Sequence, residues 1–243
     1  MAKKFTRLYV SASLSSGVRI RLSDEQAHYL MNVLRMKDGQ NLQVFNEGDG
    51  NWTAHIQMSK KIIDIMIDSK SITPSPLPPL HLYFPAIKKH RLSWLIEKAT
   101  ELGVTAFHPI MTERTHQPLP NTSKLQAIAI EASEQSERVE IPKFHPVKTL
   151  REALELLPSE NTLYVGREQR DQPSLLELST KSPHTAHIMI GPEGGFTDEE
   201  FSFMEKYPFV RFMTLSEQVL RTETAALAAL SIIGVLNLSH ARS

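Results

Sequence analysis

The sequence predicts an α/β protein with a small, strand-rich first domain and a larger second domain built on a parallel sheet. Short strands with one helix among them fill residues 7–67, and strands alternate with helices from residue 80 onward, which is typical of a parallel sheet. Between them, Ile72–Leu80 holds four prolines, which favour an extended connector. We therefore expect domains at residues 1–72 and 73–243. A surface loop inside one domain is the alternative.

The first domain is expected to be a β-barrel-like module that carries one helix. Ser23 and Gln26 have the spacing of a capping box, which predicts a helix from there to about Arg35. Gly48-Asp-Gly50 predicts the turn of a hairpin. The expected strands cover residues 7–10, 18–22, 41–46, 52–58 and 62–67.

The second domain is expected to alternate regularly. Its strands cover residues 80–85, 105–111, 162–165, 187–190 and 210–215, and its helices residues 91–102, 122–138, 149–157 and 222–236, with one more opened by a capping box at Thr197 and Glu200. The last helix is apolar nearly all round, so several of its sides must be covered. A partner subunit or the domain's own core could do this.

Composition excludes several classes of protein. The 243 residues hold 27 basic and 27 acidic side chains, which excludes a uniformly basic nucleic-acid binder. The chain has no cysteine, which excludes disulfides, zinc knuckles and a thiol nucleophile. His184 and His187 have no carboxylate at a useful spacing, so no metal is expected. With no signal peptide and no apolar run of about 20 residues, we expect a soluble cytoplasmic protein without a membrane segment.

The segment from Ile190 to Thr197, Ile-Gly-Pro-Glu-Gly-Gly-Phe-Thr, is the first candidate for chemistry. It joins a buried strand to a capped helix, at the sheet edge where open α/β proteins bind ligands. Its glycines let the backbone approach a ligand closely. Glu193 disfavours a phosphate because like charges repel, so a ligand with neutral or cationic parts suits the loop better. A tight turn without a ligand is the alternative.

The second candidate is the segment from Leu215 to Ala225, where a strand ends and the last helix starts. Thr222 has the chemistry of an N-cap residue. That role does not explain Leu220 and Arg221 at the helix entrance, where small polar residues are usual. Arg221 and Glu223 are therefore candidates for function, although the two could simply pair with each other.

These segments resemble a known family. Gly191-Pro-Glu-Gly-Gly-Phe196 together with Leu220-Arg-Thr-Glu-Thr-Ala225 is similar to the two signature loops of RsmE-type ribosomal RNA (uracil-N3) methyltransferases, members of the SPOUT superfamily. Ser216 departs from the pattern, since the family commonly has glycine there. Further matches are Glu97–Val104, Glu113–Thr115, Glu131–Arg138 and, in the PUA-like RNA-binding module of the family, Leu34–Gly39.

The resemblance implies a homodimeric enzyme with a deep trefoil knot in its second domain and a PUA-like first domain. It implies that S-adenosyl-L-methionine lies between the two loops and that N3 of a uridine in 16S ribosomal RNA, or in the small ribosomal subunit, receives the methyl group. The implied cofactor residues are Ile190, Gly191, Pro192, Gly194, Gly195, Leu215, Ser216, Leu220, Thr222, Thr224 and Ala225.

The chemistry assigns roles to two side chains. Methyl transfer from a sulfonium is an in-line displacement, so alignment is most of the task. Uracil N3 must also lose its proton. Glu223 is the candidate acceptor, and Arg221 the candidate stabiliser of the developing charge or a phosphate clamp. The absence of cysteine argues against methylation at C5 through a thiol adduct.

Arginines are the candidates for RNA contact. Arg19 and Arg21 flank Ile20, so on a strand both point to one face. Solvated surface charge is the alternative explanation. The full predicted set is Arg7, Arg19, Arg21, Arg35, Arg114 and Arg138. Two other functions stay open, a ribose 2′-O-methyltransferase of the same superfamily and a non-catalytic RNA-binding or ribosome-assembly factor.

Overall fold

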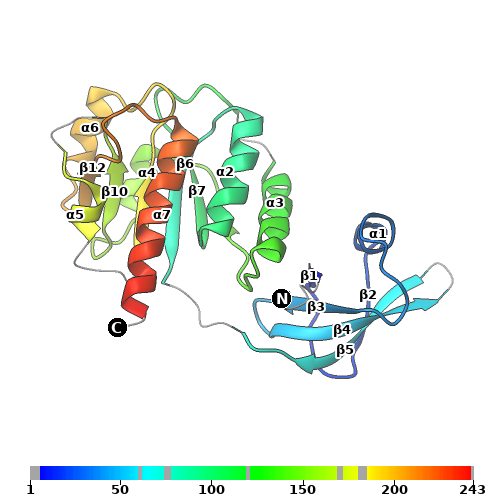
Figure 1. Ribbon diagram of the computed structural model, residues 1–243. Coiled ribbons are helices and arrows are strands. Elements are labelled where there is room, and N and C mark those ends of the chain that lie inside the picture. The colour runs from blue at the N-terminus through cyan, green and yellow to red at the C-terminus, as the bar shows by residue number, and fades with distance from the viewer. Residues whose placement is uncertain are drawn as a thin grey trace. The chain divides into compact units, whose positions relative to one another are not determined.

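The computed structural model divides the chain into two compact units (Figure 1). It describes residues 6–59, 62–73, 78–118, 121–168, 172–179 and 185–241, with side chains to Asn237 in the last helix. The first unit comprises Met1–Ser75 and Ser133–Ile141, and the second Pro76–Ala132 and Pro142–Ser243. The centre of the predicted connector, residues 74–77, lies outside the described residues, as do residues 1–5 and His184.

The first unit is a five-stranded sheet in the order β1-β3-β4-β5-β2. Only β1 and β3 are parallel; the other neighbours are antiparallel. No pairing joins β1 to β2 in the described part of the chain, so the closed barrel stays a prediction. The strands are β1 Arg7–Tyr9, β2 Arg19–Arg21, β3 Asn41–Asn46, β4 Gly50–Ser59 and β5 Ile62–Lys70.

The helix of this unit is shorter than the sequence predicts. The capping box is present, because Ser23 accepts from the Gln26 amide and Gln26 accepts from the Ser23 amide. The α-helix, α1, covers only Asp24–His28, and Tyr29–Val33 continue as a π-helical turn (η1) that keeps Leu30 fully buried. Arg35 then has a φ of 55°, a left-handed conformation that cannot continue a helix.

The second unit is a parallel sheet in the order β12-β10-β11-β6-β7-β8, with β9 also paired to β7. Every pairing in it is parallel, which confirms the predicted α/β class. The two-residue strands β8 and β9 were not predicted. The strands are β6 Leu80–Pro85, β7 Ala106–Met111, β8 Lys143–Phe144, β9 Lys148–Thr149, β10 Leu163–Gly166, β11 Ala186–Met189 and β12 Val210–Met213.

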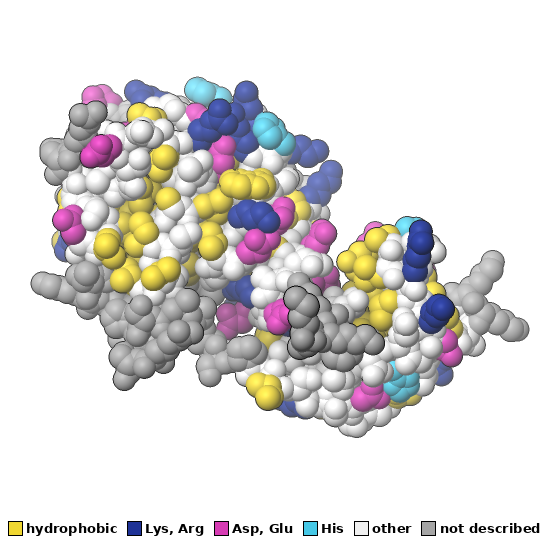
Figure 2. All heavy atoms as spheres, in the orientation of Figure 1, with side chains coloured by type: hydrophobic (Ala, Val, Ile, Leu, Met, Phe, Trp, Pro, Cys, Tyr) yellow, Lys and Arg dark blue, Asp and Glu magenta, His cyan; other side chains and the backbone are white. Residues whose placement is uncertain are grey.

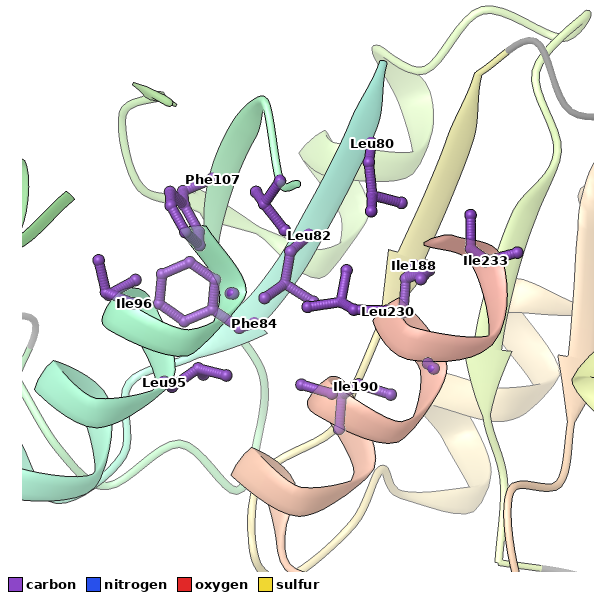
Figure 3. Packing of buried hydrophobic residues seen from close by; sticks show 14 of the residues in the cluster. Leu80, Leu82, Phe84, Leu95, Ile96, Phe107, Ile188, Ile190, Leu230 and Ile233 are labelled. Carbon is purple, nitrogen blue, oxygen red and sulfur yellow. The ribbon is translucent and has the colours of Figure 1, made fainter. Parts of the chain in front are cut away.

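Helices cover both faces of this sheet. On one face of the sheet, residues of α2, α3, α5 and α7 pack with the strands in a single apolar cluster. On the opposite face, residues of α4 and α6 belong to a second apolar cluster. Figure 3 shows Phe84 of β6 beside Ile96 of α2, and Leu230 of α7 between Leu82 of β6 and Ile188. The helices are α2 Lys89–Glu101, α3 Thr122–Gln135, α4 Leu150–Glu155, α5 Leu175–Ser179, α6 Asp198–Met204 and α7 Thr222–Ala241.

Helix α3 ends earlier than predicted, and helix α5 was not predicted. Helix α3 stops at Gln135, three residues before Arg138, and Glu137 has a φ of 61°. A left-handed residue there prevents the helix from running on. Helix α5 was not predicted, because its five residues are too few to show a helical period.

The apolar last helix is covered in part by its own unit. Ala226, Ala229, Leu230 and Ile233 are buried in the core, whereas Val235 is 63% exposed. Figure 2 shows hydrophobic side chains gathered on the face where Figure 1 places α7. Among the described residues, no helix combines the length and the apolar character that a membrane span requires.

Candidate functional site

The first candidate loop follows β11 and turns sharply before α6. The Gly195 amide donates to the Pro192 carbonyl at 2.8 Å, and Gly195 has a φ of 70°, which suits glycine. Thr197 caps α6 as predicted, accepting from the amide of Glu200. Residues 191–195 thus form a bend that exposes main-chain atoms at the carboxyl end of β11.

The second candidate loop follows β12 and is hydrogen-bonded to the first. The Thr222 hydroxyl donates to the Gly191 carbonyl at 3.0 Å. Helix α7 begins at Thr222 itself, so the predicted N-cap role for Thr222 is wrong. Its hydroxyl is hydrogen-bonded to the first loop and does not cap the helix. Ser216 accepts from the Gln218 amide at 3.1 Å, which braces the loop at its departure from the family pattern.

The two loops enclose a cavity of about 430 Å³, a size typical of small-molecule sites. It opens at the carboxyl ends of β10, β11 and β12, where α/β sheets bind ligands. All the residues named for the cofactor line it except Thr224, which is exposed. The lining members of that set are Ile190, Gly191, Pro192, Gly194, Gly195, Leu215, Ser216, Leu220, Thr222 and Ala225.

Two glycines of the first loop leave room that a side chain would take. A Cβ at Gly191 would lie 3.1 Å from the ring of Phe196, which is 5% exposed. A Cβ at Gly194 would lie 3.2 Å from Cδ of Arg114, whose guanidinium donates to the Gly194 carbonyl. Both contacts are tighter than ordinary packing, so a side chain at either position would require the Phe196 ring or the Arg114 side chain to shift.

Sequence reasoning missed part of the lining. Gly166, Arg167 and Glu168 reach the cavity from the end of β10. They carry no local motif, and the signal that could have found them is the position of β10 between β11 and β12 in the sheet. Arg114, one of the predicted RNA contacts, lies on the cavity wall.

The loop that carries Arg114 is fixed by a buried carboxylate. Glu200 accepts from the amides of Glu113 and Thr197, each at 2.9 Å. Its exposed fraction is only 7%, so both hydrogen bonds are shielded from water. The cap of α6 therefore also positions the loop at residues 112–115 against the glycine loop.

Arg221 and Glu223 lie beside the cavity and not in its wall. Arg221 is exposed, whereas Glu223 is 6% exposed, with Oε1 3.5 Å from Nε of Arg91. Nη1 of Arg91 lies 3.5 Å from Oε1 of Glu193 in the first loop. The sequence left open a pairing of Arg221 with Glu223. In the structure Glu223 pairs instead with Arg91 of α2, which also contacts Glu193 and was not among the predicted site residues.

Glu223 also keeps a free acceptor. Its Oε2 atom is buried and has no hydrogen-bond partner among the described residues. A buried carboxylate oxygen without a donor is costly, and such an atom is common where a ligand supplies the missing donor.

Comparison with known proteins agrees with this geometry. Residues 73–234 match the family model of the RNA methyltransferase domain, and residues 22–67 match that of the RNA methyltransferase PUA domain. The chain is 32% identical over 240 residues to the ribosomal RNA small subunit methyltransferase E of Rickettsia conorii, covering 98% of each. The chain belongs to the ribosomal RNA small subunit methyltransferase E family. This confirms the predicted resemblance.

Two further members extend the likeness. The methyltransferase E of Bacillus subtilis is 28% identical and covers 87% of this chain and 88% of its own length. The crystal structure of the methyltransferase E of Neisseria gonorrhoeae, bound to S-adenosyl methionine, superposes with a TM-score of 0.84 at 30% identity, covering 94% of this chain and 96% of that one. The family match therefore spans both units.

The arginines of the first unit that were predicted to contact RNA differ in their exposure to solvent. Arg19 and Arg21 are exposed on either side of buried Ile20, as the alternation predicted. Arg19 is held by Asp64, 2.6 Å away, and Arg35 is exposed. These three keep a solvent-facing guanidinium.

Arg7 must be removed from the predicted set of RNA-contacting arginines, because it is buried. It is 6% exposed, and its guanidinium donates to the carbonyls of Ser133 and Arg138 and to the side chain of Asn51. It also lies over the Phe45 ring, 4.2 Å from the centroid. Arg7 ties residues 133–138 to the first unit and so serves the fold. Arg138 itself is partly buried, and burial lowers the pKa of its guanidinium.

Proposed function

We propose that the protein transfers the methyl group of S-adenosyl-L-methionine to N3 of one uridine in the 16S ribosomal RNA of the small subunit, in the cytoplasm. The observation that carries this proposal is the single cavity formed by the two signature loops. Membership of the methyltransferase E family supplies the cofactor and the class of substrate. The choice of N3 rests on the resemblance to uracil-N3 methyltransferases.

The cavity suits this cofactor in size and chemistry. Leu215, Leu220 and Ala225 offer apolar surface to an adenine ring, and the glycines of the first loop offer main-chain donors and acceptors. When bound, the sulfonium supplies an electrophilic methyl group. Because this ligand carries a sulfonium and an ammonium group against one carboxylate, its net charge is positive, and the carboxylates of Glu168 and Asp198 at the cavity do not oppose it.

Glu223 and Arg221 carry the proton and charge chemistry in this proposal. The unpartnered Oε2 of Glu223 is the group that accepts the N3 proton of uracil. Nε of Arg91 lies 3.5 Å from Oε1 of the same carboxylate and so orients it. Exposed Arg221, next to the cavity entrance, stabilises the charge that develops on the uracil oxygens.

The RNA is bound by both predicted domains. We assign RNA binding to residues 1–72, through Arg19, Arg21 and Arg35, and catalysis to residues 73–243. Arg138 adds a further RNA contact. Phosphate contacts of this kind position an RNA without reading its sequence.

A homodimer and a trefoil knot complete the proposed architecture. Trp94 of α2 and Val235 of α7 are 44% and 63% exposed, and α2 packs against α7. Large apolar side chains on one face of a helix pair favour a subunit interface. We propose that two chains meet there, and that the cofactor loops belong to a knotted segment.

The test is a methylation assay on small subunits from a strain that lacks this protein, followed by digestion of the RNA and mass spectrometry. The expected product is 3-methyluridine at one site. A 2′-O-methylated nucleoside would overturn the choice of N3 in favour of ribose methylation. Absence of any transfer, together with no calorimetric binding of S-adenosyl-L-methionine, would leave a non-catalytic RNA-binding factor.

A further inference from the structure

Four histidines form a row across the face of the parallel sheet that packs against α4. His187 of β11, His81 of β6, His108 of β7 and His145 after β8 come from four neighbouring strand positions. Ring centroids of His187 and His81 are 4.4 Å apart, and those of His108 and His145 are 4.1 Å apart. Nδ1 of His81 lies 2.9 Å from Nε2 of His108. We call these residues the histidine row.

The row borders a second cavity, of about 380 Å³, that shares no lining residue with the cavity of the two loops. It lies toward the amino ends of β6 and β11, because His81 and His187 are the second residues of these strands. Leu156, Leu157 and Pro158 form apolar walls, and Lys148 supplies the one charged group of the described lining. The same lining contains no aspartate or glutamate.

The imidazoles of the row are neutral at physiological pH. Burial lowers the pKa of His108 to about 2 and that of His187 to about 3, and it lowers the pKa of His81 and of His145 as well. A neutral imidazole offers one donor and one acceptor. The row is therefore a hydrogen-bonding and stacking surface, with its positive charge confined to Lys148.

One nitrogen of the row lacks a partner. His187 is 4% exposed, and its Nε2 atom is buried with no hydrogen-bond partner among the described residues. Buried polar atoms of this kind are rare in the absence of a ligand or water, because each costs about 1–3 kcal/mol. Since His187 lines the cavity, a molecule inside it can supply the missing bond.

The rings beside the cavity are arranged for stacking. His108 lies between Tyr83 and His145, at 4.3 and 4.1 Å, with interplanar angles of 9° and 10°. Both faces of the His108 ring are thus covered, so a nucleobase, which stacks on aromatic rings of this type, can reach the stack only at its His145 end, where the side chain is half-buried. The rings face one another and do not converge on a point, and no group of three or more ligating side chains could hold a metal ion in the described ranges.

We propose that this cavity binds one nucleotide, with its base against the rings of the row and bonded to Nε2 of His187, and its phosphate at Lys148. Apolar walls, neutral hydrogen-bonding rings and a single cation match a planar heterocycle that carries one anionic group. The nucleotide can be free or a residue of an RNA strand. This site does not depend on the function proposed for the loop cavity.

The test follows the imidazole resonances of histidine-labelled protein during titration with uridine 5′-monophosphate, in the presence of saturating S-adenosyl-L-methionine. We expect the His187 and His145 signals to shift and to saturate. Lys148→Met and His187→Phe should each weaken binding by about tenfold. Lys124→Met, which removes an exposed lysine of α3 outside the cavity, is the matched control and should leave binding unchanged.

Separate arms identify the source of the nucleotide. A short single-stranded oligoribonucleotide that produces the same shifts would assign the site to RNA, and shifts with the mononucleotide alone would assign it to a free nucleotide. The proposal is overturned if neither probe shifts these signals at millimolar concentration. It is equally overturned if inorganic phosphate alone reproduces the shifts, or if Lys148→Met binds as the parent protein does.

Discussion

The two cavities of the parallel sheet are built in different ways. The cavity at the carboxyl ends of the strands comes mainly from two continuous chain segments whose glycines present the main chain. The cavity of the histidine row takes its polar atoms from single side chains on separate strands. A site made of contiguous segments can be read as a motif, whereas a site made of dispersed side chains becomes visible only when the strand order and register are known.

This difference explains which parts of the candidate site could be predicted. Residues 190–196 and 220–225 were found because each segment is continuous in the chain and sits between a strand and a helix. Gly166 and Arg91 were missed, since neither has a local pattern that points to the cavity or to Glu223. His81, His108 and His187 are 27 and 79 residues apart in the chain and meet only through the sheet.

The fold, too, could be predicted where it depends on local sequence patterns and not where it depends on distant residues. Strand and helix periods predicted most elements and the parallel class, because alternating burial is a local property. The buried role of Arg7 could not be predicted, since its partners Ser133 and Arg138 are more than a hundred residues away. The π-helical turn at Tyr29–Val33 replaces a regular helix without any sequence signal that we can identify.

The largest effect is expected from Arg221, beside the loop cavity. Arg221→Ala should lower kcat by about a hundredfold or more, because a side chain that stabilises developing charge is lost. S-adenosyl-L-methionine affinity and the sedimentation of the protein should not change. Arg211→Ala, which removes an exposed arginine of β12, is the control. Retained full activity in Arg221→Ala would remove this residue from the mechanism.

A smaller effect is expected from Gly191 in the same cavity. Gly191→Ala places a Cβ 3.1 Å from the buried Phe196 ring, so the wall must shift. Calorimetry should show S-adenosyl-L-methionine binding weakened by about tenfold, while nucleotide binding at the histidine row is unaffected. Gly48→Ala, whose Cβ would meet only an ordinary 3.7 Å contact, is the matched control. Equal affinity of Gly191→Ala and the parent would contradict a tightly fitted glycine wall.

Arg91 should have a weaker influence, because it acts through Glu223. Arg91→Ala should lower kcat several-fold at an unchanged KM, and Arg91→Lys should restore part of the loss by keeping a cation near the carboxylate. The pH profile of kcat in Arg91→Ala should also be displaced, which a purely structural role would not cause. Parallel changes in KM and in thermal stability without that displacement would argue for a structural role.

The histidine row should make the free energy of unfolding depend on pH. Burial lowers the folded-state pKa values of His108 and His187 to about 2 and about 3, below the ordinary histidine pKa of 6.5, so the unfolded chain binds more protons in acid. Their contribution is complete above about pH 6.5 and is lost as the pH falls toward the folded values. The free energy of unfolding in urea should drop by about 1 kcal/mol per pH unit for each histidine.

His187→Phe should flatten this dependence, because a phenyl ring has no proton to take up. The matched comparison is His28→Phe, since His28 lies at the exposed end of α1 in the first unit. A slope that is the same in His187→Phe as in the parent would contradict the neutral, buried state of the row.

The most direct measurement for the central claim is a crystal structure of the protein with S-adenosyl-L-methionine. The cofactor should occupy the cavity between residues 190–196 and 215–225, in contact with Gly191, Leu215 and Leu220, and should be absent from the histidine row. A cofactor bound at the histidine row, or an empty loop cavity at saturating concentration, would contradict the account.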